Sequence, residues 1–107
     1  GGGEVLKIPN INVHSNNFIL KDNYPNPFNP LTTISYELLN EGVVKIIIYD
    51  LVGTKIKTLT SEFQTAGSKN VNWNATNNQG QLVSAGVYLY SVEAGKFRQT
   101  KKMVLLK

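Results

Sequence analysis

Apolar and polar residues alternate with a period of two along most of the chain from residue 31 onwards. The segment 33–38 alternates strictly, which predicts a strand with one buried face. After a turn at residues 40–42, the segment 43–49 resumes the pattern, but Ile47 and Tyr49 make its second face apolar as well. A strand that is apolar on both faces suits a central position in a sheet.

Glycines mark the turns that follow. Gly53 can take a positive φ, so we expect a turn at residues 50–53. Beyond this turn, Ile56 and Leu59 are three residues apart, and this spacing breaks the alternation. The break predicts a β-bulge or a strand end between the two residues.

The last third of the chain predicts a hairpin. The window 87–92, which opens after Gly86, is the most strand-like of the sequence, and a final strand is expected over residues 97–106. A tight reversal separates these two strands. Glu93 and Lys96 are expected to face each other across it.

Together the segments give about seven strands at a spacing of about 8 to 12 residues, without helical periodicity, which favours an all-β, antiparallel immunoglobulin-like β-sandwich. Trp73, the single tryptophan, is the expected core anchor, and residues 74–81 form a polar loop. Residues 1–17 are rich in Gly and Asn and are expected to be a linker or N-terminal extension. The folded domain is therefore expected to span residues 18–107.

The charge of the chain adds one local feature. A length of 107 residues with 41% hydrophobic and 17% charged residues is typical of one globular domain. The net charge is +4, and the last twelve positions hold five of the eleven basic residues. These are Lys96, Arg98, Lys101, Lys102 and Lys107. They could meet phosphate, acidic lipopolysaccharide or an acidic protein groove, or could form a solvated strand face. Nucleic acid is not expected, because no basic helix or RNA-recognition motif accompanies them.

No pattern of residues predicts catalysis, and we expect a non-enzymatic domain without cofactor or metal. The only histidine, His14, lies next to Ser15 in the linker segment, and the carboxylates are scattered among turns and strands. Cysteine is absent, which excludes disulfides and thiolate zinc sites. The Asn-rich loop 74–79 lacks the carboxylates typical of calcium sites. No apolar run is long enough for direct membrane insertion.

Two segments stand out at the ends of the folded region. Residues 23–30 read NYPNPFNP, and their three prolines exclude a helix or a central strand, so we expect an extended approach to the fold. The last seven residues are Lys101, Lys102, Met103, Val104, Leu105, Leu106 and Lys107. An edge strand of this kind can pair with the open sheet edge of a receptor, although lysine on an edge strand is also ordinary protection against aggregation. The sequence does not decide which face of this strand is buried, because residues 103 and 105 on one face and residues 104 and 106 on the other are all apolar.

These segments, taken in order, resemble the type A C-terminal sorting domain of the type IX secretion system. The resemblance covers roughly residues 18–107 and rests on NYPNPFNP and KKMVLLK together, with VKIIIYDLVG and SAGVY between them. It implies an immunoglobulin-like domain carried at the C-terminus of an exported cargo protein of Bacteroidetes-type bacteria. It also implies partners: the type IX translocon, which recognises the domain, and a sortase-like peptidase, which removes it. The implied location is the periplasm in transit, then the medium or the cell surface of a Gram-negative bacterium, where the cargo can be attached to anionic lipopolysaccharide.

The resemblance also implies roles for particular residues. The translocon signal would be the seven residues from Lys101 to Lys107. The initial motif of the family would be Tyr24, Pro25, Asn26 and Pro27. The mid-domain motif would be Gly86 and Tyr88, for which we expect structural roles. The chain departs from the family at residues 73–75, where Trp-Asn-Ala replaces the common Trp-Asp-Gly and brings a shared tight turn or ion into question.

Two other interpretations are open. The immunoglobulin-like module of flagellar hook-capping proteins shares the run from NPFNP to GVY but has a scaffold role, and it would not need the terminal KKMVLLK. An accessory module that binds carbohydrate would need exposed aromatic residues on one face. The candidates are Tyr24, Tyr49, Tyr88, Tyr90 and Phe97, and we expect each of them in the core instead.

Overall fold

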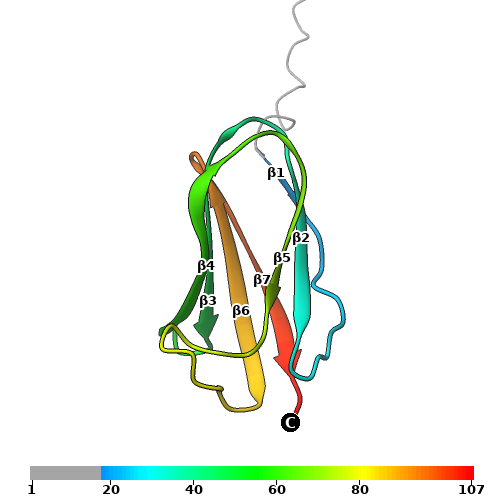
Figure 1. Cartoon of the computed structure of the whole chain (residues 1–107), viewed down its shortest axis with the longest axis vertical. Coiled ribbons are helices and arrows are strands. Elements are labelled where there is room, and N and C mark those ends of the chain that lie inside the picture. Colours follow the sequence, from blue (N-terminus) through cyan, green and yellow to red (C-terminus); the bar gives the residue numbers. More distant parts are fainter. Residues whose placement is uncertain (1–17) are drawn as a thin grey trace, which may run out of the picture.

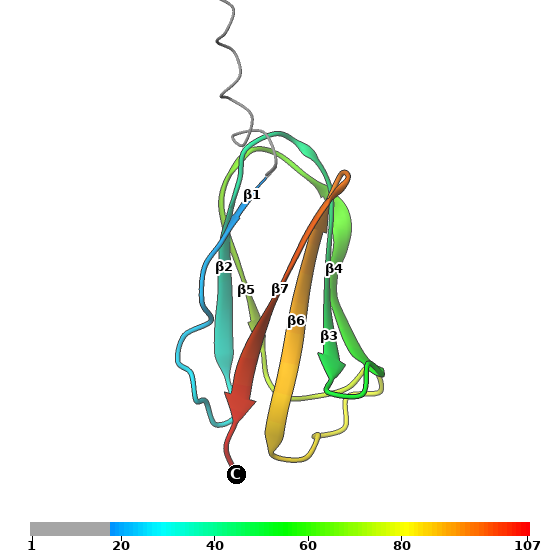
Figure 2. The same cartoon turned by 180° about the vertical axis from the view of Figure 1, so that it is seen from behind.

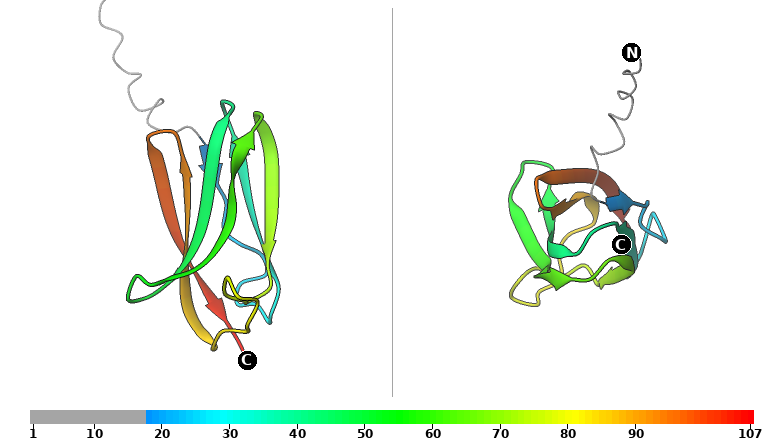
Figure 3. Two further views of the ribbon diagram at one scale, coloured as in Figure 1. Left: turned by 60° about the vertical axis from the view of Figure 1, so that its left-hand side comes forward. Right: turned by 90° about the horizontal axis from the view of Figure 1, so that it is seen from above.

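In the computed structural model, which describes residues 18–107, seven strands form two sheets (Figure 1). The strands are β1 (Phe18–Leu20), β2 (Thr32–Leu38), β3 (Gly42–Asp50), β4 (Lys55–Gln64), β5 (Gly67–Trp73), β6 (Gly86–Ala94) and β7 (Phe97–Leu105). One sheet has the order β1-β2-β5 and the other β4-β3-β6-β7, and they face each other as a sandwich (Figure 3). This confirms the predicted immunoglobulin-like class. No helix long and apolar enough to cross a membrane occurs within these residues.

The two-sided apolar pattern of β3 matches its position. β3 lies between β4 and β6. Val44, Ile46 and Ile48 are fully buried between the sheets, while Ile47 and Tyr49 are half-buried on the outer face. The prediction of a central strand is therefore confirmed, because β3 pairs with β4 along one edge and with β6 along the other.

The turn after β3 and the irregularity in β4 also follow the predictions. Gly53 has a φ of 91°, and the Asp50 carboxylate accepts hydrogen bonds from the N–H groups of Val52 (3.1 Å) and Thr54 (2.8 Å). The β3–β4 register shifts twice, between Ile46 and Ile47 and between Ile48 and Tyr49. These shifts leave Leu59 and Ile56 of β4 without a cross-strand partner, so the alternation breaks at bulges and the strand continues through them.

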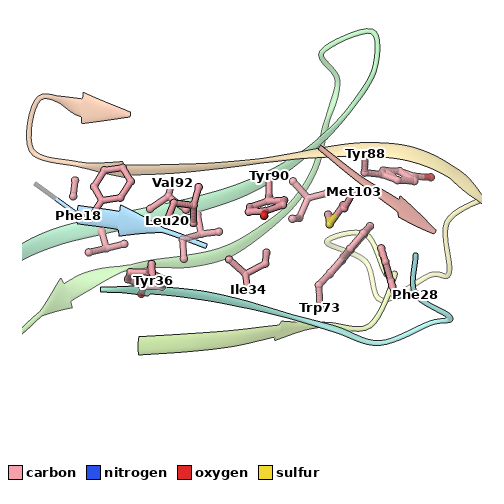
Figure 4. Close-up of a cluster of buried hydrophobic side chains, with 14 of the residues drawn as sticks. Phe18, Leu20, Phe28, Ile34, Tyr36, Trp73, Tyr88, Tyr90, Val92 and Met103 are labelled. Atoms are coloured by element: carbon pink, nitrogen blue, oxygen red, sulfur yellow. The ribbon is translucent and has the colours of Figure 1, made fainter. Parts of the chain in front are cut away.

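Trp73 anchors the core, as expected (Figure 4). Its ring lies 5.8 Å from that of Phe28 and 5.4 Å from that of Tyr88, measured between ring centroids. Its indole N–H donates a 2.9 Å hydrogen bond to the carbonyl oxygen of Thr76. A buried tryptophan with a satisfied N–H and tilted aromatic neighbours contributes packing without leaving a polar group unpaired.

The β6–β7 hairpin corrects one expectation. Glu93 lies opposite Arg98, and Lys96 occupies the turn, so Glu93 and Lys96 do not face each other. The reason lies in the loop, which consists of Gly95 and Lys96 and is closed by the pair of residues 94 and 97. Gly95 has a φ of 63°, a conformation that glycine favours at the first position of such a loop.

Candidate recognition site on the terminal strand

The face of β7 that packs into the core is set by Met103 and Leu105. Both are buried, Val104 is half-buried on the outer face, and Leu106 is 50% exposed. Met103 pairs with Tyr88 and Leu105 with Gly86, so their side chains join the cluster around Trp73 (Figure 4). The sequence did not decide which face of β7 is buried. In the structure it is the face that carries Met103.

The three lysines of the predicted signal have different surroundings. Lys101 is half-buried, and its Nζ lies 3.0 Å from the Asp22 carboxylate, which follows β1. This ion pair joins β7, the edge strand of one sheet, to the segment that follows β1 of the other sheet. Lys102 and Lys107 are exposed. The side chains that the predicted signal presents freely to a partner are therefore Lys102, Leu106 and Lys107.

The proline-rich segment covers the outer edge of the end of β7. The Phe28 N–H donates to the carbonyl oxygen of Val104 (3.0 Å), and the Leu106 N–H donates to the carbonyl oxygen of Phe28 (2.8 Å). The Val104 N–H donates to the side-chain oxygen of Asn26 (2.9 Å). Residues 26–28, which we call the edge clamp, thus bind the outward-facing backbone groups at this end of β7, as the loop beside β7 in Figure 2 illustrates.

The mid-domain motif lies on the other side of the same strand end. Gly86 has a φ of 151° and pairs with Leu105. Tyr88 is buried, its ring packs against Trp73, and its hydroxyl donates a 2.6 Å hydrogen bond to the carbonyl oxygen of Ser84. Burial raises the pKa of Tyr88, with a smaller contribution from the negative charge of Asp50. Three motifs that are far apart in sequence therefore meet at the end of β7.

The remaining residues of the initial motif have backbone roles. Tyr24 exchanges two hydrogen bonds with the backbone of Thr33 (3.0 and 2.9 Å), while its side chain is 79% exposed. The Pro25 carbonyl oxygen accepts a 2.8 Å hydrogen bond from the Thr32 hydroxyl, and Pro27 is exposed. The four residues thus hold the proline-rich segment against the start of β2, and Tyr24 offers an aromatic ring to solvent.

The other aromatic candidates do not form an exposed carbohydrate-binding face. Tyr88 and Tyr90 are buried, and Tyr49 and Phe97 are half-buried. The Tyr90 hydroxyl accepts a hydrogen bond from the Asn23 N–H (3.0 Å) and donates one to the carbonyl oxygen of Lys21 (3.1 Å). The expected core role is therefore confirmed for Tyr88 and Tyr90, and Phe97 packs against the core. The expectation is wrong for Tyr24, which is exposed, and for Tyr49, which lies on the outer face of β3.

The Trp-Asn-Ala departure is accommodated locally. Ala75 is buried and has a φ of 63°, the left-handed conformation that glycine adopts more easily. The loop that follows is held by Asn77, whose side-chain oxygen accepts hydrogen bonds from the N–H groups of Gln79 and Gln81 (3.0 Å each). A tight loop thus forms without the carboxylate. Between residues 18 and 107 no group of three or more His, Cys, Asp or Glu side chains could hold a metal ion, and a non-enzymatic role stays a prediction.

Two of the contacts that hold β7 in place had no signal in the sequence. Asn26 and Val104 are 78 residues apart, and Asp22 and Lys101 are 79 residues apart. The proline-rich and terminal segments could each be singled out by composition. Their contact depends on the sandwich that brings the loop between β1 and β2 beside the edge of the other sheet.

A family model described as FlgD Ig-like domain matches residues 33–96. The chain belongs to this family. The matched range ends before β7 and begins after the proline-rich segment. No curated protein sequence matches this immunoglobulin-like domain significantly.

Solved structures share the fold of the domain. Dimeric latent PorU from Porphyromonas gingivalis is 20% identical with a TM-score of 0.66, over 83% of this chain and 9% of that chain. PorZ of the same organism, described as an essential surface component of the type-IX secretion system, is 24% identical with a TM-score of 0.59, over 82% and 11%. FlgD from Xanthomonas campestris is 19% identical with a TM-score of 0.58, over 81% and 64%. The chain thus spans only about a tenth of the two Porphyromonas proteins.

Proposed function

We propose that this domain is a non-catalytic C-terminal sorting domain that directs an exported cargo protein through the type IX secretion system. The observation that carries the proposal is the convergence of the proline-rich segment, the Gly86–Tyr88 motif and the terminal segment on one edge strand. A hydrophobic core alone does not require a hydrogen bond between two residues that are 78 positions apart in the sequence. The fold shared with PorU and PorZ supports the same proposal.

In this proposal the parts of the molecule have distinct roles. Lys102, Leu106 and Lys107 would contact the translocon, because they are the exposed side chains of the terminal segment. The cargo would precede the domain, and a sortase-like peptidase would cut between them. The protein would pass through the periplasm and reach the medium or the cell surface.

A scaffold role like that of a flagellar hook-capping module is the second candidate, and the family match favours it. One experiment separates the two functions. A fluorescent reporter with a signal peptide is fused to residues 18–107 and expressed in a type IX-competent host and in a host without the translocon. We expect extracellular fluorescence in the first host alone, whereas periplasmic retention in both hosts would favour the scaffold role.

A pair of variants then tests the terminal segment without removing core residues. Leu106→Asp combined with Lys107→Glu changes two exposed side chains and should reduce secretion of the fusion. Lys55→Glu changes an exposed lysine of β4, the opposite edge of the same sheet, and should leave secretion unchanged. Equal secretion of both variants would contradict recognition through the terminal segment.

A further inference from the structure

The outer edge of β7 has a covered part and an open part. Backbone N–H and C=O groups of a strand alternate in direction, so residues 98, 100 and 102 point the same way as Val104. The outward N–H and C=O groups of Val104 and the N–H group of Leu106 are bound by the edge clamp. Within residues 18–107, β7 ends the sheet order and no strand lies beyond it. The backbone of Arg98, Thr100 and Lys102 therefore forms an open edge.

This open edge is unusually regular. The pairing of β6 with β7 runs without a shift from Gly86↔Leu105 to Ala94↔Phe97. The opposite edge strand of the same sheet, β4, shifts register twice against β3. Bulges are one of the devices that make an edge strand unsuitable for pairing with another chain. β7 lacks this device, so its edge keeps the geometry that an added strand requires.

The side chains along the open edge are cationic. Arg98 and Lys102 flank Thr100 on the outer face of the sheet, and all three are exposed. Arg98 lies opposite Glu93 and donates a 3.2 Å hydrogen bond to the Ser91 hydroxyl. Lys102 lies opposite Leu89, and no acidic residue pairs with it in the described part of the chain. An incoming strand would therefore meet a positive charge at Lys102 that no acidic neighbour compensates, and a second positive charge at Arg98, which has Glu93 opposite it on β6.

The charge pattern also discriminates between occupants. If two copies of the chain paired antiparallel over Thr100, Arg98 of each copy would lie opposite Lys102 of the other. Like charges directly opposite each other destabilise an antiparallel pair. A strand with carboxylates at these two positions would instead gain two favourable cross-strand pairs.

We propose that the open edge of β7, residues 98–102, binds an extended acidic segment of a partner protein as an added antiparallel strand. The partner's backbone pairs with Thr100 and its neighbours, and its carboxylates lie opposite Arg98 and Lys102. The edge clamp limits the added strand to the part of β7 before Val104. The proposal specifies how the sorting domain is recognised and to that extent rests on the proposed function.

Proline at position 100 tests the backbone contact directly. The N–H of residue 100 points away from β6, so proline removes an outward donor while the β6–β7 hydrogen bonds remain. Thr100→Val is the matched control, because it changes the side chain and keeps the N–H. Trp73 fluorescence during thermal unfolding shows whether each variant is folded. If Thr100→Pro is not folded, Lys102→Pro takes its place, since its N–H points the same way.

The binding assay uses the full chain labelled with ¹⁵N and a synthetic nine-residue peptide that alternates glutamate with valine. We expect chemical-shift changes centred on residues 98–102 and slower amide exchange at residues 100 and 102. Binding should be lost in Thr100→Pro and kept in Thr100→Val. Lys102→Glu should bind roughly tenfold more weakly, because it replaces a favourable charge pair with two carboxylates opposite each other, and Lys55→Glu should bind like the parent.

Several results would overturn the proposal. They are absence of peptide binding, equal binding of a peptide with lysine in place of glutamate, and binding that Thr100→Pro leaves unchanged. A concentration-dependent dimer that Thr100→Pro dissociates would show a second copy as the occupant instead. The outcome is separable from the sorting role, because secretion of the parent fusion without peptide binding would retain sorting and reject edge pairing. Peptide binding without translocon-dependent secretion would retain edge pairing and reject the sorting role.

Discussion

The side-chain oxygen of Asn26 accepts a 2.9 Å hydrogen bond from the backbone N–H of Val104, which lies 78 residues further along the chain. The neighbouring N–H of Leu106 is bound by a backbone carbonyl, that of Phe28. One strand end is thus held by a side chain and by a backbone group at adjacent outward positions. This arrangement allows the side-chain contact to be removed while the backbone contact serves as an internal reference.

Asn26→Ala should therefore loosen the end of β7 selectively. The loss of one hydrogen bond is expected to lower the free energy of unfolding by about 1 kcal/mol. Amide exchange measured by NMR should become faster at Val104 than at Leu106. Asn26→Asp keeps an acceptor oxygen and should retain slow exchange at Val104. Unchanged exchange at Val104 in the alanine variant would show that this hydrogen bond does not hold the strand end.

Met103→Ala and Leu106→Ala should differ strongly in their effect on stability. Met103 is fully buried, so its truncation should lower the free energy of unfolding by about 2–5 kcal/mol in a urea titration. Leu106 is half-exposed, and its truncation should change that free energy by less than about 0.5 kcal/mol. Equal losses would place Leu106 in the core. Because Met103 and Leu105 belong to the core, deletion of residues 103–107 would remove packing together with any signal.

Gly86→Ala should be destabilising for a conformational reason alone. Gly86 has a φ of 151°, and a Cβ added there would meet no atom within 4 Å. The expected loss in free energy of unfolding is about 1 kcal/mol or more. Gly42→Ala is the matched control, since it also has open space around its Cβ and needs no positive φ. If both variants unfold at the same temperature as the parent, the positive φ at Gly86 does not make alanine less stable than glycine there.

The stability of the domain should fall between pH 10 and pH 12. Burial raises the pKa of Tyr90 from 10.0 to about 12. In this window the unfolded chain has lost the tyrosine proton and the folded chain still holds it, so the free energy of unfolding decreases as pH rises. Below pH 10 the contribution is complete. Urea titrations across the window should show a shallower decrease for Tyr90→Phe, with some decrease remaining because burial also raises the pKa values of Tyr36 and Tyr88. An identical decrease in the phenylalanine variant would assign the effect to other groups.

The sequence predicted the fold class well because the signals it uses are local. Alternation in β2 and in β3 follows from each strand having one face toward the core. The turn at Gly53 follows from the positive φ that only glycine takes at low cost. The spacing of Ile56 and Leu59 revealed bulges, since an extra residue in a strand necessarily breaks its period of two.

The sequence was less informative wherever neighbouring positions carry similar side chains or the loop length was ambiguous. Near its end, β7 has apolar residues on both faces, so only the packing of Met103 against the Trp73 cluster decided which face is buried. The partner of Glu93 depended on a loop formed by Gly95 and Lys96, and a shift of one residue in the loop changes every cross-strand pair.

The sequence by itself determined that this chain forms short strands joined by glycine and proline turns, with a cationic strand at its end. These properties depend on backbone preferences and on periodicity within a few residues. Only the tertiary structure decided that Asn26 and Phe28 cover the end of β7, that Lys101 is paired with Asp22, and that the edge from Arg98 to Lys102 stays open. The physical reason is that these contacts join segments almost 80 residues apart, and their geometry exists only after two sheets have packed around a common core.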